Sequence, residues 1–153
     1  MVATSTDRIE KQVVLRASRS RVWRALTEAD QFGQWFGVKL ACPFVAGEPV
    51  TGQITQSGHE HIPFNLTIER MEPERVLTWR WHVLIDAGNG RVSEPTTLVE
   101  FHLEDADGGT LFTVTESGFD SMHPEYRDAA YRGNESGWSQ QMASIERYLA
   151  EAA

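Results

Sequence analysis

Cysteine is nearly absent from this chain, which has one copy in 153 residues. Cys42 has no partner in the chain for a disulfide, and alone it cannot build a cysteine-based metal cluster. Chains without disulfides are typical of reducing compartments. We therefore expect a cytoplasmic protein.

Long apolar runs are also missing. No stretch approaches the roughly 18 consecutive apolar residues of a membrane-spanning helix, so we expect no membrane insertion. Residues 1–7 are small and polar, and they lack the basic start and apolar core of a signal peptide. We expect them to form a flexible tail, followed by a single domain over residues 8–153 with one real core.

Basic residues are fewer than acidic ones. The chain has 14 lysine and arginine residues against 22 aspartate and glutamate residues, which gives a formal net charge of −8. A chain of this sign is repelled by phosphate backbones and by anionic membranes. We therefore expect no nucleic-acid partner.

Sequence signatures of catalysis and of metal binding are absent or incomplete. The chain has no Gly-x-Ser-x-Gly string, and its glycine pairs lack the spacing of a phosphate-binding loop before a helix. His59 and His61 could share one face of a strand, but no spacing supplies the further ligands of a zinc site, so a solvated turn is favoured. We expect neither a metal ion nor another cofactor.

Alternation of apolar and polar residues is the strongest positive signal. It predicts about six or seven antiparallel strands, among them residues 8–16, 50–56, 64–69, 77–83, 99–104 and 111–117. The last two of these form a hairpin around Gly108 and Gly109. A polar connection over residues 85–95 precedes the hairpin.

Helical spacing predicts two short helices after the first strand, over residues 18–29 and 30–36. A long amphipathic helix opens at Gly137 and Trp138. Its apolar face carries Met142, Ile145 and Leu149. The chain is therefore α+β, with one layer of helix against a curved sheet.

Several short strings, spread in order over nearly the whole chain, resemble the activator of heat-shock-protein ATPase-like family of the START-like (SRPBCC) superfamily. The strings are Arg21–Leu26 (RVWRAL), Gln34–Phe36 (QWF), Glu74–Trp81 (ERVLTWRW), Gly109–Leu111 (GTL), Glu116–Phe119 (ESGF) and Gly137–Trp138 (GW). The resemblance implies the helix-grip fold. In that fold a strongly bent antiparallel sheet wraps around a long C-terminal helix and leaves a pocket between them.

The resemblance also implies a range of functions. Relatives in the superfamily bind lipids, sterols or polyketides, and some act as cyclases or aromatases. The eukaryotic namesake of the family is a co-chaperone in the stress response. It uses an additional N-terminal domain that we do not expect here, so chaperone interaction is not expected either.

Aromatic residues on the predicted inward faces are the candidate pocket wall. They are Trp35, Phe36, Trp79, Trp81, Phe101, Phe119 and Trp138. Ordinary core packing would explain each of them as well, since aromatic residues dominate cores. Gln141 and Met142 lie about one turn beyond Trp138 and are candidate ligand contacts, although an exposed amide would explain Gln141 equally.

Glu116 is an acid that the alternation places inward, on the same strand face as Phe112 and Val114. It could lie at the strand end and pair with an arginine or a backbone donor, which is the commoner fate of a buried acid. Alternatively, it could be a polar anchor or a general base in an apolar pocket.

Three functions are compatible with these residues. The leading hypothesis is a binding protein that holds a hydrophobic small molecule, such as a lipid, a sterol or a polyketide-like compound, between the sheet and the C-terminal helix. The second is a cyclase or aromatase in which Glu116 accepts a proton and Gln141 steadies an enolate. The third is a protein-interaction domain that acts on a chaperone or a regulator and whose cavity is filled by its own side chains. A homodimer is left open.

Overall fold

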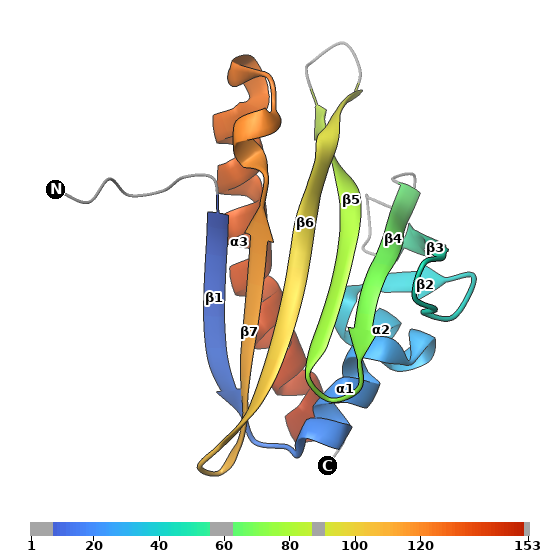
Figure 1. Ribbon diagram of the computed structural model, residues 1–153, viewed down its shortest axis with the longest axis vertical. Coiled ribbons are helices and arrows are strands. Elements are labelled where there is room, and N and C mark those ends of the chain that lie inside the picture. Colours follow the sequence, from blue (N-terminus) through green and yellow to red (C-terminus); the bar gives the residue numbers. More distant parts are fainter. Residues whose placement is uncertain (1–7, 56–62, 87–90, 152–153) are drawn as a thin grey trace, which may run out of the picture.

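The computed structural model describes residues 8–55, 63–86 and 91–151, which form seven strands and four helical segments (Figure 1). The strands are β1 Arg8–Leu15, β2 Val38–Leu40, β3 Pro49–Ile54, β4 Pro63–Glu72, β5 Val76–Asp86, β6 Arg91–Ala106 and β7 Gly109–Ser117. The helices are α1 Arg19–Thr27, α2 Ala29–Phe36, the short 3-10 helix η1 Phe119–Ser121 and α3 Pro124–Glu151. The predicted α+β class is confirmed, including the two short helices after the first strand.

The strands form one antiparallel sheet in the order β1-β7-β6-β5-β4-β3-β2. In Figure 1, α3 runs behind β1 and β7, whereas α1 and α2 lie beside the lower end of β4. The sheet therefore curves around the long helix on one side and meets the short helices on the other. This is the helix-grip arrangement.

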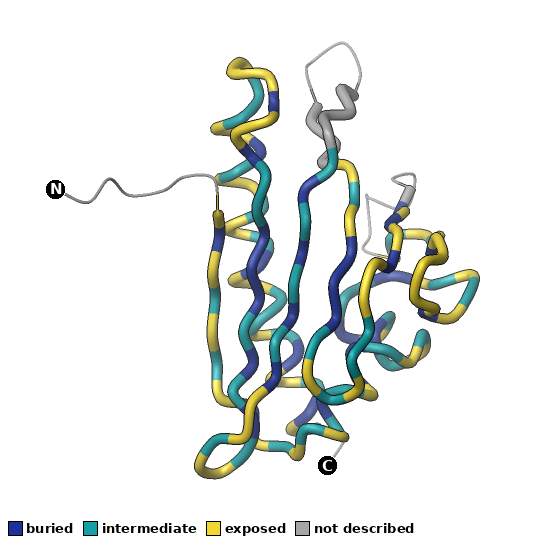
Figure 2. The backbone as a smooth tube through the Cα atoms, in the orientation of Figure 1, coloured by how far each residue is buried: buried dark blue, intermediate teal, exposed yellow. Residues whose placement is uncertain are grey.

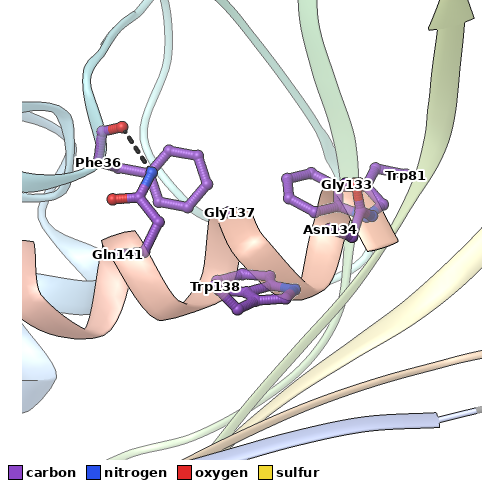
Figure 3. A pocket seen from close by; sticks show the side chains of 7 residues that line it. All are labelled: Phe36, Trp81, Gly133, Asn134, Gly137, Trp138 and Gln141. Carbon is purple, nitrogen blue, oxygen red and sulfur yellow. Dashed lines mark hydrogen bonds between the residues drawn. The ribbon is translucent and has the colours of Figure 1, made fainter. Parts of the chain in front are cut away.

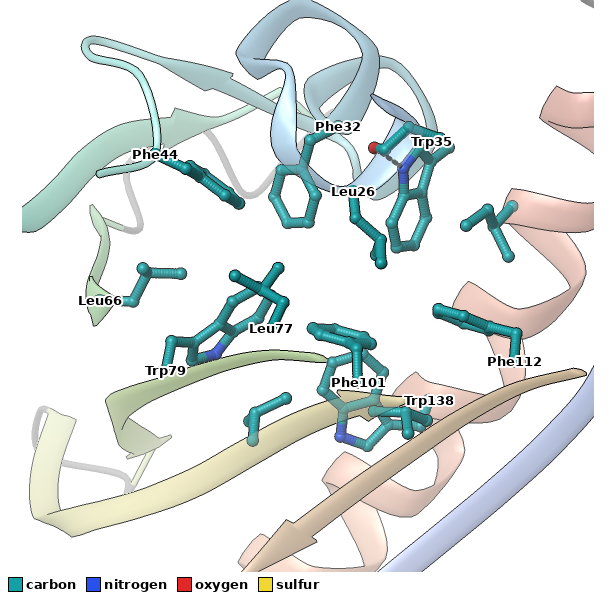
Figure 4. Packing of buried hydrophobic residues seen from close by; sticks show 14 of the residues in the cluster. Leu26, Phe32, Trp35, Phe44, Leu66, Leu77, Trp79, Phe101, Phe112 and Trp138 are labelled. Atoms are coloured by element: carbon teal, nitrogen blue, oxygen red, sulfur yellow. Dashed lines mark hydrogen bonds between the residues drawn. The ribbon is translucent and has the colours of Figure 1, made fainter. Parts of the chain in front are cut away.

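One face of the sheet carries the core. In β4, Phe64, Leu66 and Ile68 are buried while Asn65 and Thr67 between them are exposed. Successive side chains of a strand point to opposite faces, which produces this alternation (Figure 2). The inward side chains join those of the helices in a single hydrophobic cluster (Figure 4).

Gly37 ends α2 by adopting a left-handed backbone conformation with φ of 90°. Glycine is the usual residue at this position because a side chain is disfavoured there. The turn leads directly into β2, a strand too short for its alternation to be predicted, whose residue Val38 pairs with Ile54 of β3. Phe36, the last residue of α2, is thereby fixed beside α3.

The long helix α3 begins at Pro124, roughly three and a half turns earlier than the predicted start at Gly137. Proline is favoured in a first helical turn, and the backbone N–H of Glu125 donates to Nδ1 of His123 at 3.1 Å. Ala130 is the one residue that α3 buries before Trp138. Apolar periodicity could not reveal these turns because they have almost no apolar face.

The pairing of β5 with β6 also extends further than predicted. The segment 85–95 was expected to be a connection, but the ladder continues to the pair Asp86 and Arg91. A register shift after His82 allows the strand to contain Pro95. Proline is tolerated at such irregularities because it has no N–H to donate to the ladder.

Two predictions fall on residues that the structure does not describe. They are the flexible tail over residues 1–7 and the turn with His59 and His61. Of the helices that are described, none is both long and apolar enough to cross a membrane.

Candidate functional site

Glu116 lies near the end of β7 on the face that packs against α3. Its side chain has no solvent exposure, in line with Phe112 and Val114 on the same face, which are 1% and 0% exposed. Burying a carboxylate is costly unless hydrogen bonds replace its lost water. The surroundings of Glu116 must therefore supply donors.

Four side chains from three elements donate to Glu116. Trp81 of β5 donates through Nε1 to Oε2 at 2.9 Å, and Thr97 of β6 donates through Oγ1 to the same oxygen at 2.5 Å. From α3, Trp138 donates through Nε1 to Oε1 at 2.8 Å. Asn134, one turn earlier, places Nδ2 at 2.9 and 3.0 Å from the two oxygens.

These donors saturate the carboxylate. A carboxylate offers about four acceptor positions, and four side chains occupy them. All four donors are neutral, and none of the ion pairs within the described ranges involves Glu116. The partners of Glu116 are therefore neutral side chains, and not the arginine or backbone donor that the sequence favours. Through them Glu116 joins β5, β6 and β7 to α3.

A small pocket of about 110 Å³ lies against this network (Figure 3). It is lined by Phe36, Trp81, Gly133, Asn134, Gly137, Trp138 and Gln141. Three of the four donors to Glu116 therefore form part of its wall. Glu116 itself lies behind them, so the carboxylate fixes the wall without lining the pocket.

Three aromatic rings form the apolar part of the wall. The ring of Phe36 lies 6.2 Å from that of Trp81 and 6.1 Å from that of Trp138, measured between centroids. The two indoles are stacked with their centroids 5.9 Å apart. Gln141 donates through Nε2 to the carbonyl oxygen of Phe36 at 2.9 Å, which ties the end of α2 to α3 (Figure 3).

On the helix side, two glycines line the pocket beside Asn134, Trp138 and Gln141. Gly133 and Gly137 lie one turn apart on α3, and a Cβ added to either would meet no atom within 4 Å. Residues four apart share one face of a helix. Open space therefore follows this face of α3 next to the rings.

The other predicted pocket residues lie elsewhere. Trp35, Trp79, Phe101 and Phe119 are 0–3% exposed and belong to the hydrophobic cluster, and Met142 packs partly buried against it. The ring of Trp79 lies 4.9 Å from that of Phe101, and both are packed within the cluster in Figure 4. The indole N–H of Trp35 donates to the carbonyl oxygen of Ala25 at 2.7 Å, whereas Nε1 of Trp79 has no acceptor in the described part of the chain.

Sequence reasoning missed Asn134, Thr97 and Gly133. The signal for Asn134 was present, because it precedes Trp138 by four residues and so lies on the same face of the helix. Gly133 has the same spacing from Gly137. No local pattern marks Thr97, whose role depends on the pairing of β6 with β7.

Comparison with known proteins supports this architecture. The family described as Activator of Hsp90 ATPase homolog 1-like protein matches residues 16–150. No curated protein matches the chain in sequence.

Solved structures share the fold at low sequence identity. Protein NE0264 from Nitrosomonas europaea has a TM-score of 0.76 and 17% identity, and the match covers 100% of both chains. The Aha1 dimer from Colwellia psychrerythraea has a TM-score of 0.67 and 20% identity over 93% of this chain and 95% of that one.

A third structure is DynU16, a putative protein in the dynemicin biosynthetic locus, with a TM-score of 0.73 and 24% identity. The match covers 94% of this chain and 47% of DynU16. Identities this low show the common fold alone. Because the family match spans most of the sequence, the chain belongs to the Activator of Hsp90 ATPase homolog 1-like family.

Proposed function

We propose that this protein binds an apolar small molecule in the pocket between α3, the end of α2 and β5. The observation that carries the proposal is that three aromatic rings line the pocket and that two of them, the indoles of Trp81 and Trp138, donate hydrogen bonds to one buried carboxylate. Binding sites for small molecules are mostly apolar and contain a few fixed polar groups. The ligand classes to consider are lipids, sterols and polyketide-like compounds.

The hydrogen bonds of Glu116 favour a preorganised wall. The indole rings of Trp81 and Trp138 cannot turn without losing a bond to the buried carboxylate. Side chains fixed before binding lose less conformational entropy when the ligand arrives. Glu116 is thus a positioning residue in this proposal.

The same bonds weigh against the cyclase or aromatase alternative. A general base must come within hydrogen-bond reach of the proton it accepts. Both oxygens of Glu116 already accept hydrogen bonds, and Trp81, Asn134 and Trp138 separate it from the pocket. We therefore propose binding, and not proton transfer, as the role of the site.

Tryptophan fluorescence tests the proposal directly. The protein is titrated with fatty acids, sterols, aromatic polyketides and single-ring phenols. The polyketides are included because one fold relative comes from a biosynthetic locus. At least one class is expected to give a saturable change. If every class fails to give one, the proposed function is wrong.

A pair of matched variants locates the binding. Trp138→Phe replaces the indole that lines the pocket by a smaller ring without an N–H, and Trp35→Phe makes the same change at an indole that also donates one hydrogen bond but lies in the core. We expect Trp138→Phe to weaken ligand binding and Trp35→Phe to leave it unchanged, although both lose stability. Equal effects on binding would place the ligand elsewhere.

The location and the assembly state belong to the same proposal. We propose a cytoplasmic protein, in keeping with the single Cys42. We also propose a homodimer, because the relative from Colwellia psychrerythraea is described as a dimer. Light scattering that gives the mass of one 17.2 kDa chain at all concentrations would exclude the dimer.

A further inference from the structure

Two glycines inside a long helix call for a physical explanation. Gly133 and Gly137 lie in the interior of α3, a helix of 28 residues. Each glycine makes such a helix less stable than alanine would, by about 1 kcal/mol. Neither has the positive φ that would require glycine.

Close packing does not explain the two glycines. At Gly52 of β3 an added Cβ would lie 2.6 Å from the carbonyl oxygen of Lys39, so a side chain there would clash. At Gly133 and Gly137 the same Cβ would meet no atom within 4 Å. What the helix gains from these two residues is empty volume beside Phe36 and the two indoles.

The size of that volume limits the ligand. The pocket holds about 110 Å³. A closed apolar cavity of roughly 150 Å³ accommodates benzene, whereas drug-sized ligands occupy roughly 300–1,000 Å³. The pocket is smaller than that closed cavity but is open to solvent, so one ring can sit in it partly exposed, whereas an acyl chain or the fused rings of a sterol cannot be enclosed.

The hydrogen-bonding atoms of the pocket wall restrict the chemical class of the ligand further. Nδ2 of Asn134 faces the carboxylate of Glu116, which fixes the orientation of the amide and leaves Oδ1 as an acceptor without a partner in the described part of the chain. The N–H groups of Trp81 and Trp138 are already used by Glu116. The wall at this end offers a hydrogen-bond acceptor, and its indoles offer only their rings.

We propose that the pocket takes a single aromatic ring that carries a hydroxyl or amino group, a compound of the phenol or aniline class. The ring lies beside Gly133 and Gly137 against the three aromatic side chains, and its donor binds Oδ1 of Asn134. This inference rests on the proposed function and names the chemical class of its ligand.

A ligand series observed by NMR tests the class. Phenol, aniline and anisole are titrated while the indole N–H resonances of the tryptophans are followed, with decanoate and cholesterol as competing classes. Phenol and aniline are expected to shift the resonances of Trp81 and Trp138 and to leave that of Trp35 in place. Anisole, which has the ring but no donor, is expected to bind about fivefold more weakly.

The outcomes separate the two proposals. If decanoate or cholesterol saturates the site and phenol does not, the ring class is wrong while the binding function stands. Anisole binding as tightly as phenol overturns the role of the donor and with it the inference. If no compound binds, both proposals fail.

A glycine substitution tests the volume. Gly137→Leu places a side chain in the pocket and improves helix propensity, so it should fold at least as well as the natural protein and bind phenol roughly tenfold more weakly or worse. Ser139→Leu, an exposed position two residues further along α3, is the matched control and should bind normally. Gly137→Ala should show a smaller loss. Unchanged affinity in Gly137→Leu would overturn the inference.

Discussion

At the residue scale, Glu116 illustrates why a buried charge need not be a catalytic one. Sequence alternation predicts that it points inward but cannot identify its partners, because these come from β5, β6 and α3. In the fold, the four donors occupy both oxygens. Glu116, the candidate general base, thus uses both carboxylate oxygens to hold neighbouring side chains in place.

Glu116→Gln should destabilise the protein even though glutamine has nearly the same shape. One carboxylate oxygen becomes an NH₂ group, which faces donors, so the indole N–H of either Trp81 or Trp138 loses its acceptor. Leaving one buried donor unsatisfied costs about 1–3 kcal/mol. Urea denaturation measures the difference.

The control for this variant is Glu104→Gln, which makes the same chemical change at an exposed position of β6. It should alter the free energy of unfolding by no more than about 0.5 kcal/mol. If the two variants are equally stable, the hydrogen bonds of Glu116 do not contribute as argued.

At the element scale, the site depends on how α2 ends and on what α3 omits. Gly37 turns the chain after α2 and leaves Phe36 at the pocket, where Gln141 binds its carbonyl oxygen. On α3, Gly133 and Gly137 leave space where most helices would carry side chains. The pocket is therefore shaped by the left-handed backbone of Gly37 and by the missing side chains of Gly133 and Gly137.

Alanine substitutions should distinguish these two uses of glycine by the sign of their effect on stability. Gly37→Ala forces a side chain into the left-handed region and should cost about 1–2 kcal/mol. Gly133→Ala lies in a helix with free space around the new Cβ and should add up to about 1 kcal/mol. Thermal and urea unfolding of both variants checks this, and changes of the same sign would contradict it.

At the scale of the whole molecule, the sequence predicted the architecture better than the pocket. Strict alternation in β4, β5 and β7, together with the resemblance, was enough for the helix-grip fold. Alternation states which side chains face inward, but not whether they leave a space between them. The rings of Trp79 and Phe101 pack against each other with their centroids 4.9 Å apart, whereas Trp81, two residues further along β5, lines the pocket.

The first turns of α3 escaped prediction for a related reason. Their inward face carries Asn134, whose partner is a carboxylate on a strand, instead of an apolar stripe. A polar residue that is buried through a tertiary hydrogen bond contributes nothing to a hydrophobic period. The segment that supplies Gly133 and the amide of the pocket is therefore the one that periodicity describes least well.

The network around Glu116 predicts that α3 and the sheet unfold together. Trp81 and Trp138 sit on opposite sides of the interface between them and share one carboxylate. Separating α3 from the sheet would expose that carboxylate and leave its donors without an acceptor. A partly unfolded state with α3 detached is therefore high in free energy. Far-UV circular dichroism, dominated by the 28 residues of α3, and tryptophan fluorescence should then give coincident unfolding curves.

Glu116→Ala should weaken this coupling, because it removes the acceptor that both indoles share. We expect its fluorescence transition to shift to lower urea by more than its circular dichroism transition. Leu103→Ala, which truncates a buried side chain of β6 outside the network, is the control: it should lower both transitions together. Separate transitions in the natural protein would show that the helix can leave the sheet at little cost, and that the buried carboxylate does not hold the two halves of the fold together.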